Sequence, residues 1–183
     1  ALVMTPPLRL GFVGTGYIAG VVAAALRETE RVVVAGVASR NMSRAVAFAE
    51  ANALGAQARS FDDWRALVAW EGIDALYIAT PTTARTEIAV AAANAGKHVL
   101  AEKPFTSAAA LAAIVEACRA NGVAFLDATH FVHHPRHLLL RRTLQERIGT
   151  LLALNATFTF PSMDRSNIRH DPSLEPTGAW GDM

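Results

Sequence analysis

Residues 10–19 read LGFVGTGYIA and decide the fold of this 183-residue chain. The apolar run that ends at Val13 predicts a β-strand, and the apolar spacing that begins at Ile18 predicts an α-helix. The turn between them contains Gly14 and Gly16. A glycine-rich turn that closes a strand and opens a helix is the setting that the dinucleotide-binding fingerprint requires, so we expect this turn to bind a dinucleotide.

The small residues of this turn each have a physical role in that binding. Gly14 allows a tight turn, Gly16 lets the backbone approach a pyrophosphate, and Ala19 permits close packing of helix on strand. The first turn of the helix then offers unpaired N–H groups and the positive end of the helix dipole to the phosphates. Tyr17 stands where a mononucleotide P-loop would have its lysine, which excludes that motif. The residues expected to bind the cofactor here are Gly14, Thr15, Gly16, Tyr17, Ile18 and Ala19.

Between residues 8 and 127, short apolar runs alternate with longer stretches of helical period, which is typical of βαβ units with a parallel sheet. The glycines of Asn94-Ala95-Gly96 and Asn121-Gly122 predict two helix ends. We therefore predict an α/β fold, a Rossmann doubly wound parallel sheet of six strands. The expected strands are residues 10–13, 32–37, 73–79, 98–100 and 123–126, with a weaker one at 56–59; helices are expected over 44–54 and from the spacing of Phe61, Trp64 and Val68.

The pattern changes after residue 128. Apolar residues alternate with polar or small ones over 152–160, which predicts a strand of an antiparallel sheet. We expect residues 1–128 to form an NAD(P)-binding Rossmann domain. Residues 129–183 are expected to be the beginning of a truncated C-terminal substrate or dimerisation domain, with an α+β fold and an antiparallel or mixed sheet. The alternative is a small second lobe that another subunit completes.

The composition is that of an ordinary water-soluble protein: 52% of residues are hydrophobic, 18% are charged, and the net charge is +1. This balance gives no basic field for a nucleic acid, and the sequence has no polybasic or amphipathic stretch for a membrane surface. The single cysteine, Cys118, cannot form an internal disulfide and lies on the apolar face of a predicted helix. We therefore expect a cytoplasmic protein with a small-molecule substrate and neither a nucleic-acid nor a membrane partner.

A metal site is not expected, although four histidines fall between residues 130 and 137. His133 and His137 have the i, i+4 spacing that places two side chains on one helical face. Pro135 fits the first turn of a helix, so a helix that begins there leaves His133 outside it. No glutamate or cysteine stands at ligand spacing either.

The end of the second predicted strand indicates which cofactor is bound. NAD-binding chains place an acidic residue there to bond with the ribose 2′-hydroxyl. This chain has Ser39 and Arg40 instead. The serine hydroxyl can donate to a 2′-phosphate, the guanidinium can pair with it, and Arg44 follows one turn into the next helix. We therefore predict NADP as the cofactor, with NAD as the alternative.

A lysine follows the short apolar run at 98–100, in the sequence Glu102-Lys103-Pro104. In a doubly wound sheet, residues at the carboxyl ends of strands face the crevice where ligands bind. Lys103 would therefore lie beside the cofactor.

Several modest motifs occur in a distinctive order: the glycine turn, Ser39-Arg40, Thr80-Pro81, Gly96-Lys97-His98-Val99 and Glu102-Lys103-Pro104. In this order and spacing they resemble the Gfo/Idh/MocA oxidoreductase family, over essentially the whole chain. Later motifs resemble its dihydrodiol dehydrogenase-like branch; these are Asp127-Ala128-Thr129, residues 133–136, Gly149-Thr150 and residues 167–169.

The resemblance implies hydride transfer between the nicotinamide and a carbon that bears a hydroxyl or carbonyl, on a sugar, cyclitol or related diol. It implies that Thr80, Pro81 and Glu102 bind the cofactor together with Lys103. The ammonium of Lys103 would also be catalytic, because it can bond to the substrate oxygen and help to move the proton.

A second catalytic residue is implied near the end of the chain. Asp182 matches a family aspartate that precedes a histidine or tyrosine by four residues, and that partner would lie past Met183. We therefore expect the chain alone to bind NADP(H) but to turn over poorly or not at all. The resemblance also implies a homodimer for the full-length protein.

Two departures from the family pattern leave alternatives open. Arg85 stands where many members have a histidine, and Val132-His133-His134 replace a common Arg-Phe pair. His133 is a candidate for substrate binding or a structural residue, and Arg169 is a weaker candidate for the substrate pocket. The competing function is a regulator or partner subunit that binds NADP without catalysis, because Rossmann folds also host such uses.

Overall fold

The computed structural model describes residues 6–157, 159, 164 and 166–178. These residues form two compact units. The first contains residues 6–128 together with 168–178, and the second lies within 129–167. Each unit is described by itself below.

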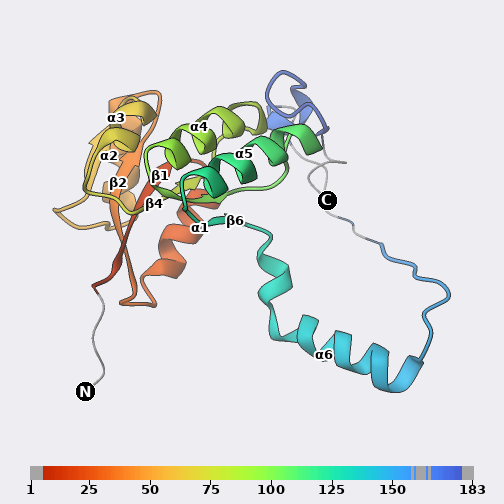
Figure 1. Cartoon of the computed structure of the whole chain (residues 1–183). Helices are drawn as coiled ribbons and strands as arrows, with labels where there is room; N and C mark the ends of the chain where they lie inside the picture. The colour runs from red at the N-terminus through yellow and green to blue at the C-terminus, as the bar shows by residue number, and fades with distance from the viewer. Residues whose placement is uncertain (1–5, 158, 160–163, 165, 179–183) are drawn as a thin grey trace, which may run out of the picture. The chain divides into compact units, whose positions relative to one another are not determined.

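The first unit is built on a six-stranded sheet with the order β3-β2-β1-β4-β5-β6 (Figure 1). All neighbouring strands are parallel, so the predicted doubly wound sheet is confirmed. The chain fills one half of the sheet from β1 outward and then returns to start the other half at β4. The strands are β1 (Leu8–Val13), β2 (Val32–Ala38), β3 (Arg59–Phe61), β4 (Ala75–Ile78), β5 (His98–Ala101) and β6 (Phe125–Asp127).

Helices cover both faces of this sheet. On one face, α1 (Tyr17–Leu26) and α2 (Met42–Ala51) bury small and aromatic side chains against the sheet. On the other face lie α3 (Trp64–Ala69), α4 (Thr82–Asn94) and α5 (Ala108–Ala120), with α4 and α5 side by side (Figure 1). Strand residues alternate between the two cores: Tyr77 joins the α1–α2 side and Leu76 the α3–α5 side.

Several local predictions are confirmed. α4 and α5 end just before the predicted glycines, which adopt φ of +73° at Gly96 and +65° at Gly122. Cys118 is 2% exposed in the core, and burial raises the pKa of its thiol. Its thiolate is disfavoured, which suits a packing residue.

Element ends differ from the prediction where a capping residue decides them. α2 begins earlier than predicted, at Met42, because the side chain of Asn41 accepts hydrogen bonds from the first-turn amides. Asp63 caps α3 in the same way. Phe61 was therefore wrongly assigned to a helix: it is the last residue of β3, which lies slightly later than the weak strand expected at 56–59.

The second unit contains the 3₁₀ helix η1 (His130–His133), α6 (Pro135–Thr143) and the π-helical turn η2 (Leu144–Ile148). α6 begins at the predicted proline. The strand expected over 152–160 is wrong for residues 151–157, which form no strand. An alternating pattern becomes a strand only where neighbouring strands pair with it, and Phe158 and Phe160 lie outside the described residues. None of the helices in the described residues is both long and apolar enough to cross a membrane.

We expect Phe12 to be a main support of the sheet. Its side chain is fully buried in β1 and meets the ring of Tyr77 edge-on, with 4.9 Å between ring centroids. Phe12→Ala should lower the free energy of unfolding by about 3–5 kcal/mol, because it leaves a cavity in a close-packed core. Chemical denaturation measures this. Val33→Ala, at a 41% exposed position of β2, is the control and should cost about 1 kcal/mol or less; equal losses in both variants would contradict this account.

Candidate functional site

The carboxyl ends of the central strands lie side by side. Val13 is in register with Ala38 and Ile78, and Ile78 is in register with Ala101. Backbone bonds continue one residue further: the amide of Gly14 donates to the Ala38 carbonyl at 3.0 Å. This alignment brings predicted cofactor residues from four different strands to one edge, namely Gly14, Ser39, Thr80 and Glu102.

The strand order predicts a ligand-binding crevice at this edge, between β1 and β4. These strands are neighbours, but the chain leaves β1 toward β2 and leaves β4 toward β5, on opposite sides. In open α/β sheets, ligands bind outside the carboxyl ends of strands at this topological switch point. The predicted glycine turn follows β1 directly.

The two glycines of the turn differ in what requires them. Gly14 has φ of +108°, and a Cβ there would lie 2.6 Å from the carbonyl oxygen of Ala79. The fold itself therefore excludes a side chain at Gly14. Gly16 has an ordinary φ of −82°, and a Cβ there would meet nothing within 4 Å. Gly16 thus leaves the space outside the turn open, as a bound pyrophosphate requires.

The N-terminus of α1 is distinguished from the other helices of the sheet by its capping. Gly16 makes no side-chain cap, and the first turn contains no acidic residue. In each of the other four helices of the sheet, a side-chain oxygen accepts a hydrogen bond from a backbone amide of the first turn. These side chains are Asn41 at α2, Asp63 at α3, Glu175 at α4 and Ser107 at α5. Within the described residues, α1 is therefore the helix whose first-turn amides remain for an anion.

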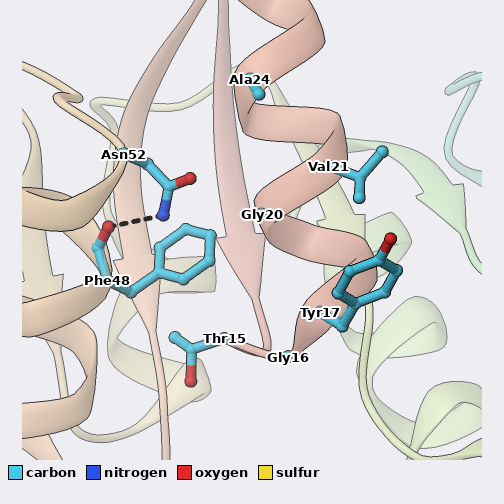
Figure 2. Close-up of a pocket in the computed structure, with 8 residues that line it drawn as sticks. All are labelled: Thr15, Gly16, Tyr17, Gly20, Val21, Ala24, Phe48 and Asn52. Atoms are coloured by element: carbon cyan, nitrogen blue, oxygen red, sulfur yellow. Dashed lines mark hydrogen bonds between the residues drawn. The ribbon is translucent and has the colours of Figure 1, made fainter.

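A depression of about 480 Å³ runs along α1 from the glycine turn (Figure 2). Thr15, Gly16 and Tyr17 form its end at the turn. Tyr17 is 89% exposed, so its ring does not cover the amides of the first turn. The remaining lining residues come from α1 and α2 and are Gly20, Val21, Ala24, Phe48 and Asn52.

The end of β2 carries positive charge without a carboxylate. Ser39 is half-buried, and Arg40 and Arg44 are exposed. The side chain of Asn41 accepts from the amides of Ser43 and Arg44 at 2.9 and 3.4 Å. Because these amides are already hydrogen-bonded, an anion here would be held by side chains. These are the hydroxyl of Ser39 and the guanidinium groups of Arg40 and Arg44.

The residue before Lys103 is held inside the sheet. The Tyr77 hydroxyl donates to Glu102 Oε1 at 2.7 Å, and both residues are buried. Burial and this carboxylate raise the pKa of Tyr77, so the phenol remains a donor. The Glu102 amide donates to the Ile78 carbonyl at 2.9 Å. These bonds fix the backbone that presents Lys103, which is half-buried.

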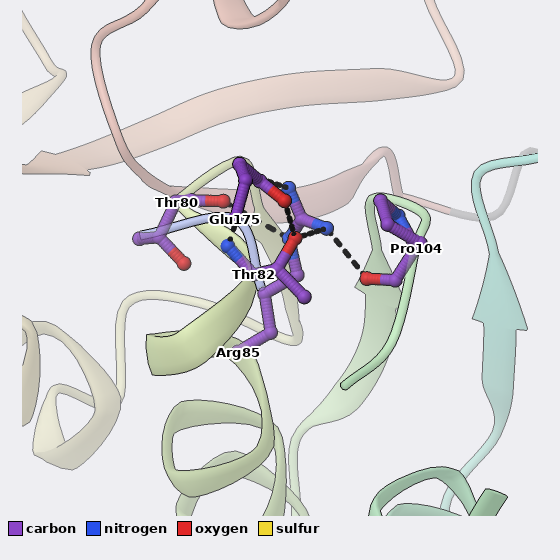
Figure 3. Close-up of polar contacts among 5 residues, drawn as sticks. All are labelled: Thr80, Thr82, Arg85, Pro104 and Glu175. Atoms are coloured by element: carbon purple, nitrogen blue, oxygen red, sulfur yellow. Dashed lines mark hydrogen bonds and ion pairs between the residues drawn. The ribbon is translucent and has the colours of Figure 1, made fainter. Parts of the chain in front are cut away.

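Three buried polar residues beside the Thr80-Pro81 turn were not predicted as site residues. They are Thr82, Arg85 and Glu175 (Figure 3). Arg85 was visible in the sequence only as a departure from the family histidine, and Glu175 gave no signal. The Thr80 hydroxyl oxygen is also buried, and it has no hydrogen-bond partner among the described residues, so it is available to a ligand.

Three other predicted site residues come from later in the chain. Asp182 lies outside the described residues. His133 is exposed in η1 of the second unit. Arg169 is half-buried in the 3₁₀ helix η3 (Ile168–His170) of the first unit. The described part of the chain contains no group of three histidine, cysteine or acidic side chains that could hold a metal ion.

A doubly wound parallel sheet, a glycine turn at the switch point and an uncapped first helix define a dinucleotide-binding Rossmann domain. Residues 8–129 match the model of the Gfo/Idh/MocA family, described as an oxidoreductase family with an NAD-binding Rossmann fold. The chain belongs to this family, as its motifs predicted.

Relatives of known activity act on sugars. The chain is 34% identical over 174 residues to a dTDP-3,4-didehydro-2,6-dideoxy-alpha-D-glucose 3-reductase from Streptomyces antibioticus, covering 93% of this chain and 52% of the relative. It is 32% identical over 167 residues to the D-xylose 1-dehydrogenase (NADP(+)) 2 of Haloferax volcanii, covering 90% and 50%. The chain thus spans about half the length of the curated relatives it matches.

A solved structure agrees with this relationship. It is a mutant of KijD10, a 3-ketoreductase from Actinomadura kijaniata, in complex with TDP-benzene and NADP. The TM-score is 0.84 at 30% sequence identity, and the match covers 92% of this chain and 51% of the other.

Alanine at the two glycines should separate folding from binding. Gly16→Ala should leave thermal stability unchanged, because its φ and surroundings accept a Cβ, yet weaken binding of a reduced nicotinamide dinucleotide about tenfold or more. Gly14→Ala should lower the free energy of unfolding by about 1–3 kcal/mol or more, because of its positive φ. Fluorescence titration and thermal unfolding measure both effects. Wild-type affinity in Gly16→Ala would contradict the placement of the pyrophosphate.

Proposed function

We propose that this chain is the NADP(H)-binding part of an oxidoreductase that interconverts a hydroxyl and a carbonyl group on a sugar, cyclitol or related diol. The observation that carries the proposal is the combination, at one sheet edge, of the uncapped α1 N-terminus, the Ser39-Arg40 pair and Lys103. Two of the similar proteins, a sugar-nucleotide 3-reductase and an NADP-dependent xylose dehydrogenase, support the same class of reaction.

The residues at the end of β2 support NADP over NAD. A 2′-phosphate needs hydrogen-bond donors and positive charge, whereas the 2′-hydroxyl of NAD needs a carboxylate acceptor. Residues 38–44 contain a serine, an asparagine, a second serine and two arginines, and no acid. We assign Ser39, Arg40 and Arg44 to the 2′-phosphate, and residues 14–19 with Thr80 and Pro81 to the remaining cofactor contacts.

In the proposed reaction, residues of the chain position the substrate and help to transfer the proton. When bound, NADPH supplies the hydride that the carbonyl carbon receives. Lys103 would donate a hydrogen bond to the carbonyl oxygen and stabilise the negative charge that develops there. It would also help to deliver the proton that this oxygen gains as it becomes a hydroxyl. Asp182 is assigned to the same proton transfer.

The domain assignment remains part of the proposal. Residues 1–128 are assigned to the cofactor domain and residues 129–183 to the start of a substrate domain. A homodimer is proposed for the full-length protein. The relatives act on different substrates, a dTDP-linked sugar in one and D-xylose in another, so the proposal names only the class of sugar-like substrates.

Arg40→Ala should reverse the cofactor preference. Loss of a charge-assisted bond to the 2′-phosphate should raise the Kd for NADPH about 10- to 100-fold and change the Kd for NADH about twofold or less. Fluorescence titration with both reduced cofactors gives the two values. Arg119→Ala, at an exposed position of α5, is the matched control and should change neither. Tighter binding of NADH than NADPH by the unaltered chain would refute the choice of NADP.

Lys103→Ala should separate an enzyme from a cofactor-binding regulator. In the full-length protein, kcat should fall about 100- to 1000-fold, because the developing charge loses its donor. NADPH affinity should stay within about threefold, because the phosphates contact other residues. The control is Lys97→Ala, which removes the other lysine of the chain, whose Nζ donates to the Ile73 carbonyl at 2.8 Å. Unchanged turnover in Lys103→Ala would contradict the catalytic role of Lys103, whereas cofactor binding without any turnover in the unaltered full-length protein would favour the regulator.

A further inference from the structure

The N-terminus of α4 is capped by residues from far along the chain. Pro81 precedes the helix and makes no side-chain bond to it. Instead, Glu175 Oε1 accepts from the Thr82 amide at 3.2 Å, and Oε2 accepts from the Thr82 hydroxyl. The Thr83 amide donates to the Leu174 carbonyl at 3.4 Å. Leu174 and Glu175 therefore attach the last described segment to α4, and Figure 3 shows the contact made by Glu175.

Arg85 connects this cap to two turns at the carboxyl edge. Its Nε donates to the Thr80 carbonyl at 2.9 Å. Its Nη1 donates to the Thr82 hydroxyl at 2.9 Å and to the Pro104 carbonyl at 2.6 Å. Its Nη2 lies 3.9 Å from Glu175 Oε1. Figure 3 shows the guanidinium between the turn after β4, the cap of α4 and the turn after β5.

Stability alone does not explain a charged pair in this place. Arg85 is 6% exposed and Glu175 is 5% exposed, so both charges are almost fully removed from water. Apolar side chains of similar volume often stabilise such a site equally well or better. What they cannot reproduce is the planar guanidinium, which donates at fixed angles and so sets the relative positions of its acceptors.

The acceptors adjoin the residues assigned to chemistry. Pro104 directly follows Lys103, and Thr80 is in the turn assigned to the cofactor. One guanidinium therefore joins the turn assigned to the cofactor to the turn that contains Lys103, and hydride transfer would require these two turns in a fixed relative placement.

We propose that Arg85 is a positioning residue: together with Glu175 it sets the placement of Lys103 against the turn after β4. This inference rests on the proposed function, because it concerns the placement of Lys103 beside bound NADP(H). Arg85 acts through Lys103 and not on the substrate.

The chain offers a direct spectroscopic test, because it contains only two lysines, Lys97 and Lys103. Reductive methylation with ¹³C gives each lysine its own dimethylamine NMR signal. Lys97 precedes β5 and Lys103 follows it, so the Lys97 signal is an internal reference at the other end of the strand.

The test variant is the double substitution Arg85→Met/Glu175→Leu. It removes both charges together, so that no buried charge is left without its partner. We expect it to fold, to keep the Lys97 signal and to bind NADP⁺ within about threefold of wild type. Its Lys103 signal should move in the free chain, and the shift that NADP⁺ induces at Lys103 should be reduced or lost. Arg85→Lys should change the Lys103 signal in the same direction, because the ammonium of lysine cannot donate hydrogen bonds at the fixed angles of the planar guanidinium.

The matched control is Arg65→Met/Glu87→Leu. This pair lies 2.6 Å apart with both side chains more than half exposed, and its removal should leave the Lys103 signal as in wild type. A folded Arg85→Met/Glu175→Leu chain whose Lys103 signal matches wild type, free and with NADP⁺, would overturn the proposal.

Two further results are decisive. If the double variant does not fold, Arg85→Lys keeps a cation beside Glu175 but loses the planar guanidinium that donates to the Thr80 and Pro104 carbonyls, and an unmoved Lys103 signal there would also overturn the proposal. If the wild-type chain does not bind NADP⁺, the proposed function fails, while the spectra of the free chains still decide whether Arg85 positions Lys103.

Discussion

The parallel pairing of β1 with β4 is the constraint on which the rest of the site depends. Val13 and Ile78 end these strands in register, yet the chain leaves them in opposite directions. Helices therefore cannot close the gap above this pair, and a crevice follows from the topology alone. Every residue assigned to the cofactor follows the carboxyl end of a strand beside this gap or belongs to the helix next in the chain. The chemistry is thus positioned by the sheet before any side chain is considered.

The helix N-termini at this edge differ in whether a side chain of the protein caps them. Asn41, Asp63, Ser107 and Glu175 satisfy the first-turn amides of four helices, and α1 is left to a ligand. The contrast between α1 and α4 is informative, because both begin at the crevice. A carboxylate at the start of α4 would repel a phosphate there, whereas α1 has no side-chain cap and is the site proposed for the pyrophosphate. The same carboxylate engages Arg85, so the cap also contributes to the placement of the turn after Lys103.

The sheet and the glycine turn were predictable from the sequence, because both depend on local patterns. A strand, a turn and a helix within residues 10–26 express their preferences over a few neighbours. The Arg85–Glu175 contact was not predictable, because its partners are ninety residues apart and each resembles an ordinary surface charge. The bond between Tyr77 and Glu102 was missed for the same reason. The prediction of a strand was wrong at residues 152–157 for the opposite reason: its pattern is local, but strand formation requires neighbouring strands.

The most direct test of the account is a crystal structure of the chain with NADP⁺ bound. The account predicts the pyrophosphate against the first-turn amides of α1 at Gly16, the 2′-phosphate against Ser39 and Arg40, and the nicotinamide facing Lys103. A dinucleotide bound away from the β1–β4 crevice would contradict it. So would a 2′-phosphate directed into solvent away from Arg40, or a nicotinamide beyond the reach of Lys103.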